Sequence, residues 1–356
     1  MNIRVLVVED SLTVRKHLVE ILSSTPGIEV VGEAVDGKQA IELCRECRPG
    51  LITMDMMLPV MSGLAATEYI MAHHPTPILI VSSSINRGEL FKTYEALAAG
   101  AVDVLEKPNG GTPDGDWEAR FIAAVRLVAR IHVITHPRAR IASAIGRPPF
   151  ARKVNLPAPV QPHQKCALVA IGASTGGPGA IVQVLRALPS KFQLPILFVL
   201  HINEPFGAVF ADWLDGQTTR RVVYPQDGDL AGAAIGHVVM APPGRHLVVR
   251  DGRFRLTHDP ERHSCRPSVD ELFLSVAAEY GAAATACLLT GMGKDGAAGL
   301  REIRNAGGLT IAQDEATSVI FGMPREAILL GAAERILPLD EIGPALAALN
   351  AGHTDS

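Results

Sequence analysis

The chain has 356 residues, of which 47% are hydrophobic and 20% are charged, and its formal net charge is −4. At ~100–200 residues per domain, this length predicts about two domains. The composition excludes an intrinsically disordered chain, and the net charge gives no global attraction to nucleic acid or to an acidic membrane surface. No apolar run reaches the ~18 residues of a membrane span, and the N-terminus lacks a signal-peptide pattern. We therefore expect a cytoplasmic protein without direct membrane insertion.

Residues 1–133 alternate short apolar segments with amphipathic ones. Short, continuously apolar segments are typical of strands that are buried on both faces of a sheet. Their alternation with helices predicts a parallel sheet with right-handed crossovers and helices on both faces. The predicted strands are Ile3–Val8, Ile28–Gly32, Leu51–Met54, Ile78–Val81 and Val102–Leu105, and the predicted helices cover about 11–24, 37–47, 63–73, 87–99 and 116–133.

Residues 134–165 are predicted to form a linker. No acidic residue occurs from Ala119 to Lys165, whereas the same stretch contains nine basic residues. Prolines recur in its second half, which favours a stiff and extended spacer over a packed element. The sequence thus indicates a basic, proline-rich segment between two domains.

Residues 166–350 are predicted to form a second α/β domain with a mostly parallel sheet and an inserted β-hairpin region. Strand-like and helical segments alternate again, except between about 221 and 257, where short strand candidates are separated by Gly, Pro and Asp. The Asp251–Gly252 pair there is a strong signal for a two-residue hairpin turn. The predicted strands are Ala167–Ile171, Ile196–Leu200, Val222–Tyr224, His237–Ala241, His246–Arg250, Arg253–Thr257, Ala283–Leu289 and Leu309–Ala312, and helices are predicted near 178–188, 268–280 and 295–306.

The cysteines do not indicate a disulfide framework, because their number is odd in a long chain. Cys44 and Cys47 form a C-x-x-C pair late in a helical pattern, so we expect two thiols near one helix face rather than a redox pair. Cys265 lies close to His258 and His263, but their spacing matches no common zinc site and favours a loop. The five cysteines of the chain are Cys44, Cys47, Cys166, Cys265 and Cys287.

Polar residues follow several strands of the first predicted sheet. Glu9 and Asp10 follow the first strand, and Asp55 follows the third. Ser82 follows the fourth strand and Lys107 follows the fifth. The carboxyl ends of parallel strands meet at one edge, where ligands bind. Each residue alone could be a helix cap or a surface residue, but together they favour Mg²⁺ and phosphate chemistry.

The first 130 residues or so resemble a response-regulator receiver domain. The segments that carry the resemblance are VLVVEDS, LITMDMMLPVMSG, ILIVSSS and AGAVDVLEKP. The resemblance implies a flavodoxin-like fold with strand order 2-1-3-4-5 and phosphorylation of Asp55 by a histidine kinase. It also implies Mg²⁺ held by Glu9, Asp10, Asp55 and the main-chain carbonyl of Met57, with Ser82 and Lys107 in contact with the phosphate. Val104 stands where many receivers have an aromatic switch residue.

A G-x-S-x-G pattern, Gly172 to Gly176, follows the first strand of the second domain. Its Ser174 is a candidate nucleophile at a tight strand-to-helix turn, although a glycine-rich helix start explains the pattern equally well. A serine nucleophile needs a base and an acid that orients it. His201 and Asp295 also follow predicted strands, so a parallel sheet would place all three side chains at one edge.

A dinucleotide site is a competing interpretation of the same domain. Gly291 to Gly296 reads G-x-G-x-x-G after a strand and before a helix, and Asp314 follows about 20 residues later. However, Asp295 would place a carboxylate inside the loop that has to meet an anionic pyrophosphate. This argues against dinucleotide binding.

The second half resembles the catalytic domain of the chemotaxis protein-glutamate methylesterase family (CheB). The motifs are IGASTGGPGAI, APPGRHL, RPSVDELFLSVA, LTGMGKDGAAGL and AQDEATSVIFGMPREAILLGAAERILPL. The resemblance implies hydrolysis of glutamate γ-methyl esters on methyl-accepting chemoreceptors, deamidation of receptor glutamines, and control by a chemotaxis histidine kinase. It implies Ser174 as nucleophile, His201 as base and Asp295 as the orienting acid, and no cofactor in this domain. The backbone N–H of Met292, with Thr175 nearby, is the expected oxyanion and substrate contact.

Two other classes of protein are alternatives to an esterase. A receiver followed by a DNA-binding output would have a small basic second domain, but residues from Cys166 onward contain 15 basic and 20 acidic residues. A scaffold that only senses phosphorylation would not need Ser174, His201 and Asp295. We therefore expect an enzyme with no nucleic-acid partner.

Overall fold

The computed structural model describes residues 2–83, 87–107, 115–131, 133, 166–202, 204 and 206–349. The chain divides into two compact units, Met1–Phe150 and Ala151–Ser356. The predicted linker, residues 134–165, lies outside the described residues, as do Pro108 and the last residues of the chain. Within the described ranges, no helix is both long enough and apolar enough to cross a membrane.

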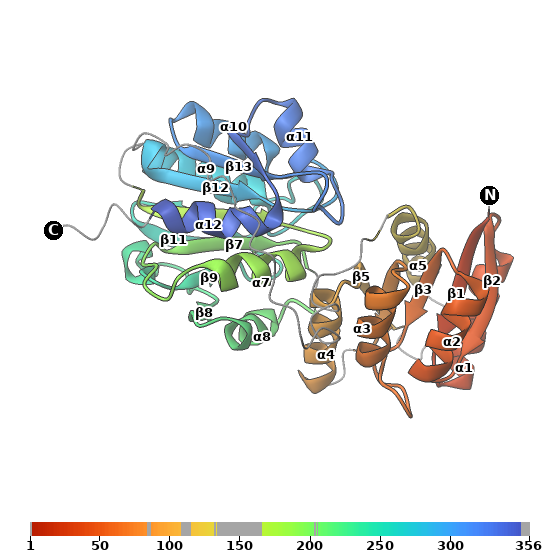
Figure 1. Cartoon of the computed structure of the whole chain (residues 1–356). Coiled ribbons are helices and arrows are strands. Elements are labelled where there is room, and N and C mark those ends of the chain that lie inside the picture. The colour runs from red at the N-terminus through yellow and green to blue at the C-terminus, as the bar shows by residue number, and fades with distance from the viewer. Residues whose placement is uncertain are drawn as a thin grey trace, which may run out of the picture. The chain divides into compact units, whose positions relative to one another are not determined.

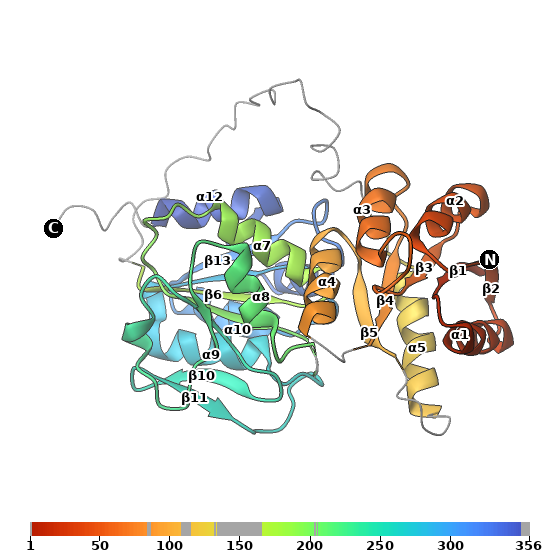
Figure 2. The same ribbon diagram turned by 90° about the horizontal axis from the view of Figure 1, so that it is seen from below.

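The first unit is a five-stranded parallel sheet with the order β2-β1-β3-β4-β5 (Figure 1). This confirms the flavodoxin-like order. Helices α1 and α5 lie together on one face of the sheet, and α2, α3 and α4 follow one another on the other face (Figure 2). The strands are β1 (Ile3–Val8), β2 (Ile28–Ala34), β3 (Leu51–Met54), β4 (Ile78–Ser82) and β5 (Asp103–Glu106), and the helices are α1 (Leu12–Ser24), α2 (Gly37–Cys47), α3 (Gly63–His73), α4 (Arg87–Ala98) and α5 (Gly115–Val128).

Burial on both faces explains why these strands are continuously apolar. Every residue of β3 and β4 is buried, including the terminal Ser82. Local capping fixes where helices begin: the Asp36 carboxylate accepts hydrogen bonds from the N–H groups of Lys38 and Gln39 at the start of α2. The strands therefore end in register at one edge, where the polar residues follow.

The second unit contains a seven-stranded parallel sheet with the order β14-β13-β12-β6-β7-β9-β8. The chain runs from β6 outward to β7 and β9, and later returns to the other side of β6 through β12. The topological switch point, where an open α/β sheet binds its ligands, is thus between β6 and β12. The strands are β6 (Leu168–Ala173), β7 (Ile196–Leu200), β8 (Val222–Val223), β9 (Val238–Met240), β12 (Ala284–Leu288), β13 (Leu309–Gln313) and β14 (Arg335–Leu337).

Helices cover both faces of this sheet. Helices α7 and α12 pack together on one face, near α8, and α9, α10 and α11 lie on the other, with the antiparallel hairpin β10–β11 against α9 (Figures 1 and 2). The helices are α7 (Gly177–Ala187), α8 (Phe210–Gln217), α9 (Val269–Tyr280), α10 (Ala297–Asn305), α11 (Met323–Leu329) and α12 (Leu339–Leu349), the hairpin strands are β10 (His246–Arg250) and β11 (Arg253–Thr257), and two 3-10 turns are η1 (Ala231–Ala234) and η2 (Gly281–Ala283).

The predicted fold class is confirmed, but several elements differ from the prediction. The hairpin region is smaller than expected, because Val222–Val223 and Val238–Met240 join the main sheet as parallel strands. Strand β14 and helices α11 and α12 were not predicted. The described part of the second unit is one large α/β layer structure rather than the small basic helical domain of a DNA-binding output.

Gly172 allows close packing between β6 and the start of α9. A Cβ atom at this position would lie 2.2 Å from Cγ1 of Val269. We expect Gly172→Ala to lower the free energy of unfolding of the second unit by about 1–3 kcal/mol, because α9 would have to shift. Urea denaturation followed by circular dichroism measures this change.

Gly216→Ala is the matched control. Gly216 lies in α8 and a Cβ there meets nothing within 4 Å. Alanine in a helix is favoured over glycine by roughly 0.5–1 kcal/mol, so this variant should be equally stable or slightly more stable. Equal stability of Gly172→Ala and the wild type would contradict the packing argument.

Candidate functional sites

Ser174 and His201 follow neighbouring strands at the same level of the second sheet. Ala173 of β6 is in register with Leu200 of β7, so the next residue of each strand reaches the same edge. The N–H of His201 donates to the carbonyl of Ala173 (3.1 Å), and the N–H of Ser174 donates to the carbonyl of Thr290 (3.0 Å). Ser174 therefore lies between the ends of β7 and β12.

Glycines on both sides of Ser174 allow a sharp backbone turn and close approach of the neighbouring loop. Gly176, the N-cap of α7, has φ 79°, in the left-handed region that glycine adopts without strain. The N–H of Gly177 donates to the carbonyl of Ser174 at 2.7 Å. A Cβ atom at Gly291 would lie 2.7 Å from Cβ of Ser174. These contacts fix the position of the serine at the strand-to-helix turn.

His201 and Asp295 form a partly buried pair. Nε2 of His201 lies 2.8 Å from Oδ2 of Asp295, and the side chains are 13% and 2% exposed. A buried carboxylate is stable only with strong partners. The pair thus resembles the base-and-acid half of a hydrolytic triad.

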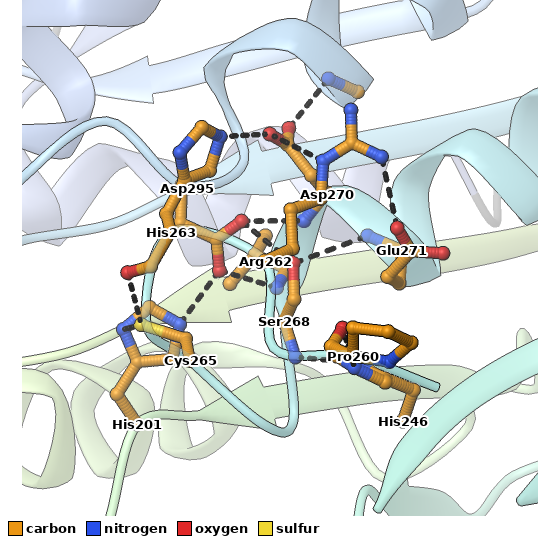
Figure 3. Close-up of polar contacts among 12 residues, drawn as sticks. His201, His246, Pro260, Arg262, His263, Cys265, Ser268, Asp270, Glu271 and Asp295 are labelled. Carbon is orange, nitrogen blue, oxygen red and sulfur yellow. Dashed lines mark hydrogen bonds and ion pairs between the residues drawn. The ribbon is translucent and has the colours of Figure 1, made fainter. Parts of the chain in front are cut away.

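The N-terminus of α9 supplies those partners for Asp295 (Figure 3). Oδ1 accepts hydrogen bonds from Oγ of Ser268 (2.7 Å) and the N–H of Asp270 (3.0 Å). Oδ2 accepts from the N–H of Val269 (2.7 Å) as well as facing His201. A helix N-terminus has unpaired N–H groups and a partial positive charge, so it favours an ionised carboxylate at this point.

The charges of this pair stabilise each other. Burial raises the pKa of Asp295, but the hydrogen bond to His201 and the donors of α9 outweigh it and hold the pKa below its ordinary value. Burial lowers the pKa of His201, but the hydrogen bonds to Asp295 and then Cys265 outweigh it and raise the pKa to about 9. The imidazole therefore keeps a proton more strongly than a free histidine does.

The second ring nitrogen of His201 contacts a thiol instead of the serine. Sγ of Cys265 lies 3.6 Å from Nδ1 of His201. Among the described residues, no hydrogen bond connects the Ser174 hydroxyl to His201. Two of the three predicted triad residues, His201 and Asp295, are thus paired in this structure. Ser174 follows the adjacent strand, β6.

Thr175 and Met292, the predicted oxyanion and substrate contacts, belong to the two loops that carry Ser174 and Gly291. The carbonyl of Thr175 accepts a hydrogen bond from Oγ1 of Thr290 (3.0 Å), which joins the two loops. Met292 follows Gly291 and is 54% exposed. Their role as donors to an oxyanion stays a prediction.

The loop from Gly291 to Gly296 does not have the arrangement of a dinucleotide site. Asp295 is buried and bonded to α9 rather than placed at the loop surface. Asp314, the expected ribose ligand, accepts hydrogen bonds from the N–H (3.0 Å) and Oγ1 (2.5 Å) of Thr317 in its own turn. These contacts favour the hydrolytic interpretation.

In the first unit, Lys107 joins the carboxylates at the strand ends. Its Nζ lies 2.9 Å from Oε2 of Glu9 and 3.0 Å from Oδ2 of Asp55. Burial lowers the pKa of Lys107, but the charges of Asp55 and Glu9 outweigh it and raise the pKa. The lysine, although far away in the sequence, thus reaches the predicted phosphoryl acceptor.

The carboxylates of Glu9, Asp10 and Asp55 could hold a divalent cation. One oxygen from each lies within 4.8 Å of the others. Burial raises the pKa of Glu9, as does the nearby charge of Asp55, and burial also raises that of Asp55. One lysine cannot neutralise three acids, so an oxygen-binding cation such as Mg²⁺ fits this donor set. Met57 follows Asp55 by two residues, and the role of its carbonyl stays a prediction.

Ser82 does not face the acids in this structure. Its side chain is buried, and Oγ donates to Oε1 of Glu89 in α4 at 3.0 Å. Val104, which stands at the expected switch position, is partly buried in β5. Contact between Ser82 and a phosphate stays a prediction.

Sequence reasoning missed three contacts of the second site. The Ser268 hydroxyl and the backbone N–H of Asp270 donate to Asp295, and the Cys265 thiol contacts His201. Ser268 and Glu271 have the S-x-x-E spacing of a capping box, which could have located the start of α9. No sequence signal shows that a distant carboxylate binds there.

We expect Ser268→Ala to lower the free energy of unfolding of the second unit by about 1–3 kcal/mol. The fully buried hydroxyl caps α9 through the N–H of Glu271 and donates to Asp295, so both contacts are lost. Urea denaturation measures the loss.

Ser62→Ala serves as the comparison, because Ser62 caps α3 through the N–H of Ala65 (3.3 Å). It should lower the stability of the first unit by about 1 kcal/mol, as an ordinary N-cap does. A loss at Ser268 no larger than that at Ser62 would show that the bond to Asp295 adds no stability.

Two family profiles match the chain. The family profile described as CheB methylesterase matches residues 169–346, and the one described as response regulator receiver domain matches residues 5–112. Both candidate sites lie within these ranges.

Similar proteins extend over nearly the whole chain. The protein-glutamate methylesterase/protein-glutamine glutaminase 2 of Anaeromyxobacter dehalogenans (strain 2CP-C) is 42% identical over 98% of this chain and 97% of its own. The protein-glutamate methylesterase/protein-glutamine glutaminase of Nitrosospira multiformis (strain ATCC 25196 / NCIMB 11849 / C 71) is 43% identical with the same coverage. Among solved structures, the Thermotoga maritima CheB methylesterase catalytic domain is 35% identical, covers 52% of this chain and 98% of its own, and has a TM-score of 0.49.

Proposed function

The chain belongs to the CheB methylesterase family and carries a response-regulator receiver domain, and from this premise we propose how its two sites work. The second unit is a protein-glutamate methylesterase and protein-glutamine glutaminase that acts in chemotaxis adaptation. Its substrates are the glutamate γ-methyl esters and certain glutamines of methyl-accepting chemoreceptors. The enzyme works on the cytoplasmic side, where a histidine kinase can reach its receiver.

The reaction is an acyl transfer through Ser174. Oγ attacks the ester carbonyl while Nδ1 of His201 takes its proton, and Asp295 stabilises the imidazolium that forms. The C–O bond to the methoxy group then breaks, and His201 returns the proton so that methanol leaves. Water cleaves the acyl-enzyme in the same way and leaves a glutamate. With a glutamine substrate, ammonia leaves instead of methanol.

One observation carries this proposal more than any other. The His201–Asp295 pair, at 2.8 Å, lies at the carboxyl ends of the strands that flank β6, and Ser174 follows β6 itself. Three residues from separate parts of the sequence thus follow three adjacent strands, β7, β6 and β12, which supports their action on one substrate. The tight glycine turn at Ser174 adds the local geometry that a nucleophile needs.

The receiver is the control element in this proposal. Asp55 accepts a phosphoryl group from the kinase, and Lys107 contacts the new phosphate as a point charge. Mg²⁺ held by Glu9, Asp10 and Asp55, with the carbonyl of Met57, would neutralise the charge of the transferring group. The phosphate adds about −1.5 to −2 charges and would draw the Ser82 hydroxyl away from Glu89.

We expect Ser174→Ala to abolish methanol release from methylated chemoreceptor membranes. The loss should be at least about 10³-fold, because no other group supplies the acyl-enzyme. Gas chromatography of methanol measures it, and Ser24→Ala, which removes a hydroxyl bonded to the carbonyl of Ile21 in α1 of the first unit, is the control. Full activity of Ser174→Ala would exclude the serine mechanism.

The activity should rise with pH. The raised pKa of His201, about 9, means that the imidazole is mostly protonated at neutral pH and becomes a base only as the pH increases. The kcat/KM should therefore increase about tenfold per pH unit below 9 and level off above it. Asp295→Asn removes the partner that raises the pKa, so the rise should move to lower pH and the plateau should fall by about 10³–10⁴-fold. A flat profile from pH 6 to 9 would contradict this role of His201.

A small phosphodonor with Mg²⁺ should increase methanol release by the wild type. Asp55→Asn should remove the increase but keep the basal rate, because the amide cannot accept the phosphoryl group and lies in the other unit. Stimulation of Asp55→Asn equal to that of the wild type would contradict phosphorylation at this residue. If the phosphodonor stimulates neither protein, the esterase activity stands and its regulation by phosphorylation is excluded.

A further inference from the structure

The segment before α9 forms a tight turn over the catalytic pair (Figure 3). Arg262 and Cys265 exchange backbone hydrogen bonds of 3.2 and 3.0 Å. The two central residues, His263 and Ser264, have φ of 53° and 59°, although neither is a glycine. Positive φ at both central positions is typical of a type I′ turn and disfavoured for these residues. Surrounding contacts therefore have to hold the turn.

Two side-chain contacts hold the turn against α9. Nε2 of His263 lies 3.2 Å from Oδ2 of Asp270, and Nη1 of Arg262 lies 2.8 Å from Oε1 of Glu271. Asp270 is fully buried and also accepts from the N–H of Gly299 (2.7 Å). The direction of the turn is thus fixed, and its last residue, Cys265, faces His201.

The contact of Cys265 with His201 is directional. Sγ lies 3.6 Å from Nδ1, while Asp295 faces Nε2 from the other side of the ring. An ionised carboxylate only accepts, so Nε2 carries a proton. The raised pKa of His201 keeps a proton on Nδ1 as well at neutral pH, so Nδ1–H donates to Sγ of Cys265. This is the same nitrogen that must take the proton of Ser174.

We propose that Cys265 is a positioning residue of the esterase: its thiol holds Nδ1 of His201 in the resting site and releases this nitrogen to Ser174 when substrate binds. The inference rests on the proposed function. The thiol keeps the ring in one orientation, with Asp295 on Nε2. It also delays the pairing of His201 with Ser174 until an ester occupies the site.

The other charged groups near His201 and Asp295 stay the same when Cys265 is replaced. His201 is faced by Asp295 from the loop before α10 and by Cys265 from the turn before α9. Around Asp295 lie Asp270 and Arg262. All of these except Cys265 are unchanged in a Cys265 variant, so a change in the titration of His201 reports the thiol.

Cys166 offers a matched control. It is partly buried like Cys265, but its Sγ bonds to the carbonyl of Leu168 and lies 3.3 Å from Oγ1 of Thr285, away from the site. Both thiols are therefore hydrogen-bonded, and only Cys265 contacts a side chain of the catalytic pair among the described cysteines.

The first experiment measures alkylation of Cys265 by iodoacetamide in the full chain, using peptide mass spectrometry. Sulfur forms a bond to the methylene carbon, iodide leaves, and the thiol proton passes to the buffer. Because a protonated imidazole 3.6 Å away stabilises the reacting thiolate, His201→Gln should slow the alkylation of Cys265 about tenfold at a fixed pH. The rate of alkylation of Cys166 should stay unchanged. Equal rates at Cys265 in both proteins would overturn the proposal, whether or not the chain is an esterase.

The second experiment compares pH profiles of methanol release. In Cys265→Ala the rise of kcat/KM should move to lower pH by about one unit, because the protonated ring loses the sulfur that accepts from Nδ1–H. Cys265→Ser keeps an oxygen that can accept from Nδ1–H and should restore part of the shift, while Cys166→Ala should match the wild type. A Cys265→Ala profile that overlays the wild type would overturn the proposal. If no protein releases methanol, the proposed function fails, and the alkylation experiment still decides the contact.

Discussion

One buried carboxylate connects the parts of the second unit. Asp295 accepts hydrogen bonds from Ser268, Val269 and Asp270 at the start of α9 and faces His201 at the end of β7. A charge this deep costs several kcal/mol of desolvation unless its oxygens are partnered. The contacts that make the charge stable are therefore the contacts that dock α9 on the sheet and orient the imidazole. Stability and chemistry depend on the same atoms.

The first unit also holds buried carboxylates, but there the negative charges outnumber the positive ones. Lys107 reaches two carboxylates from the end of β5, but the cluster with Glu9, Asp10 and Asp55 keeps an excess of negative charge. In the second unit, Asp295 and His201 match each other one to one. The excess makes the first site suited to a cation and a transferred phosphoryl group. The matched pair suits a proton that moves between neighbours.

The sequence predicts the strands best where a continuous apolar run ends at a polar residue. Ile3–Val8, Leu51–Met54 and Ile196–Leu200 agree with the structure to the residue. Strand β14 is too short to show a period, and glycines and prolines near β8 and β9 concealed their place in the main sheet. The strand-end rule brings Ser174, His201 and Asp295 to one edge. It could not find Cys265, because the turn that aims it has positive φ at His263 and Ser264 without any glycine signal.

The order of the strands also determines when the hydrolytic site comes into existence. His201 and Asp295 are 94 residues apart, and β6 lies between the strands that carry them. Closing so long a loop costs entropy that is recovered only when both halves of the sheet have paired. During synthesis the receiver emerges first and the acid of the catalytic pair late. A ribosome-bound or truncated chain that stops before β12 therefore contains the nucleophile and the base but no working hydrolase.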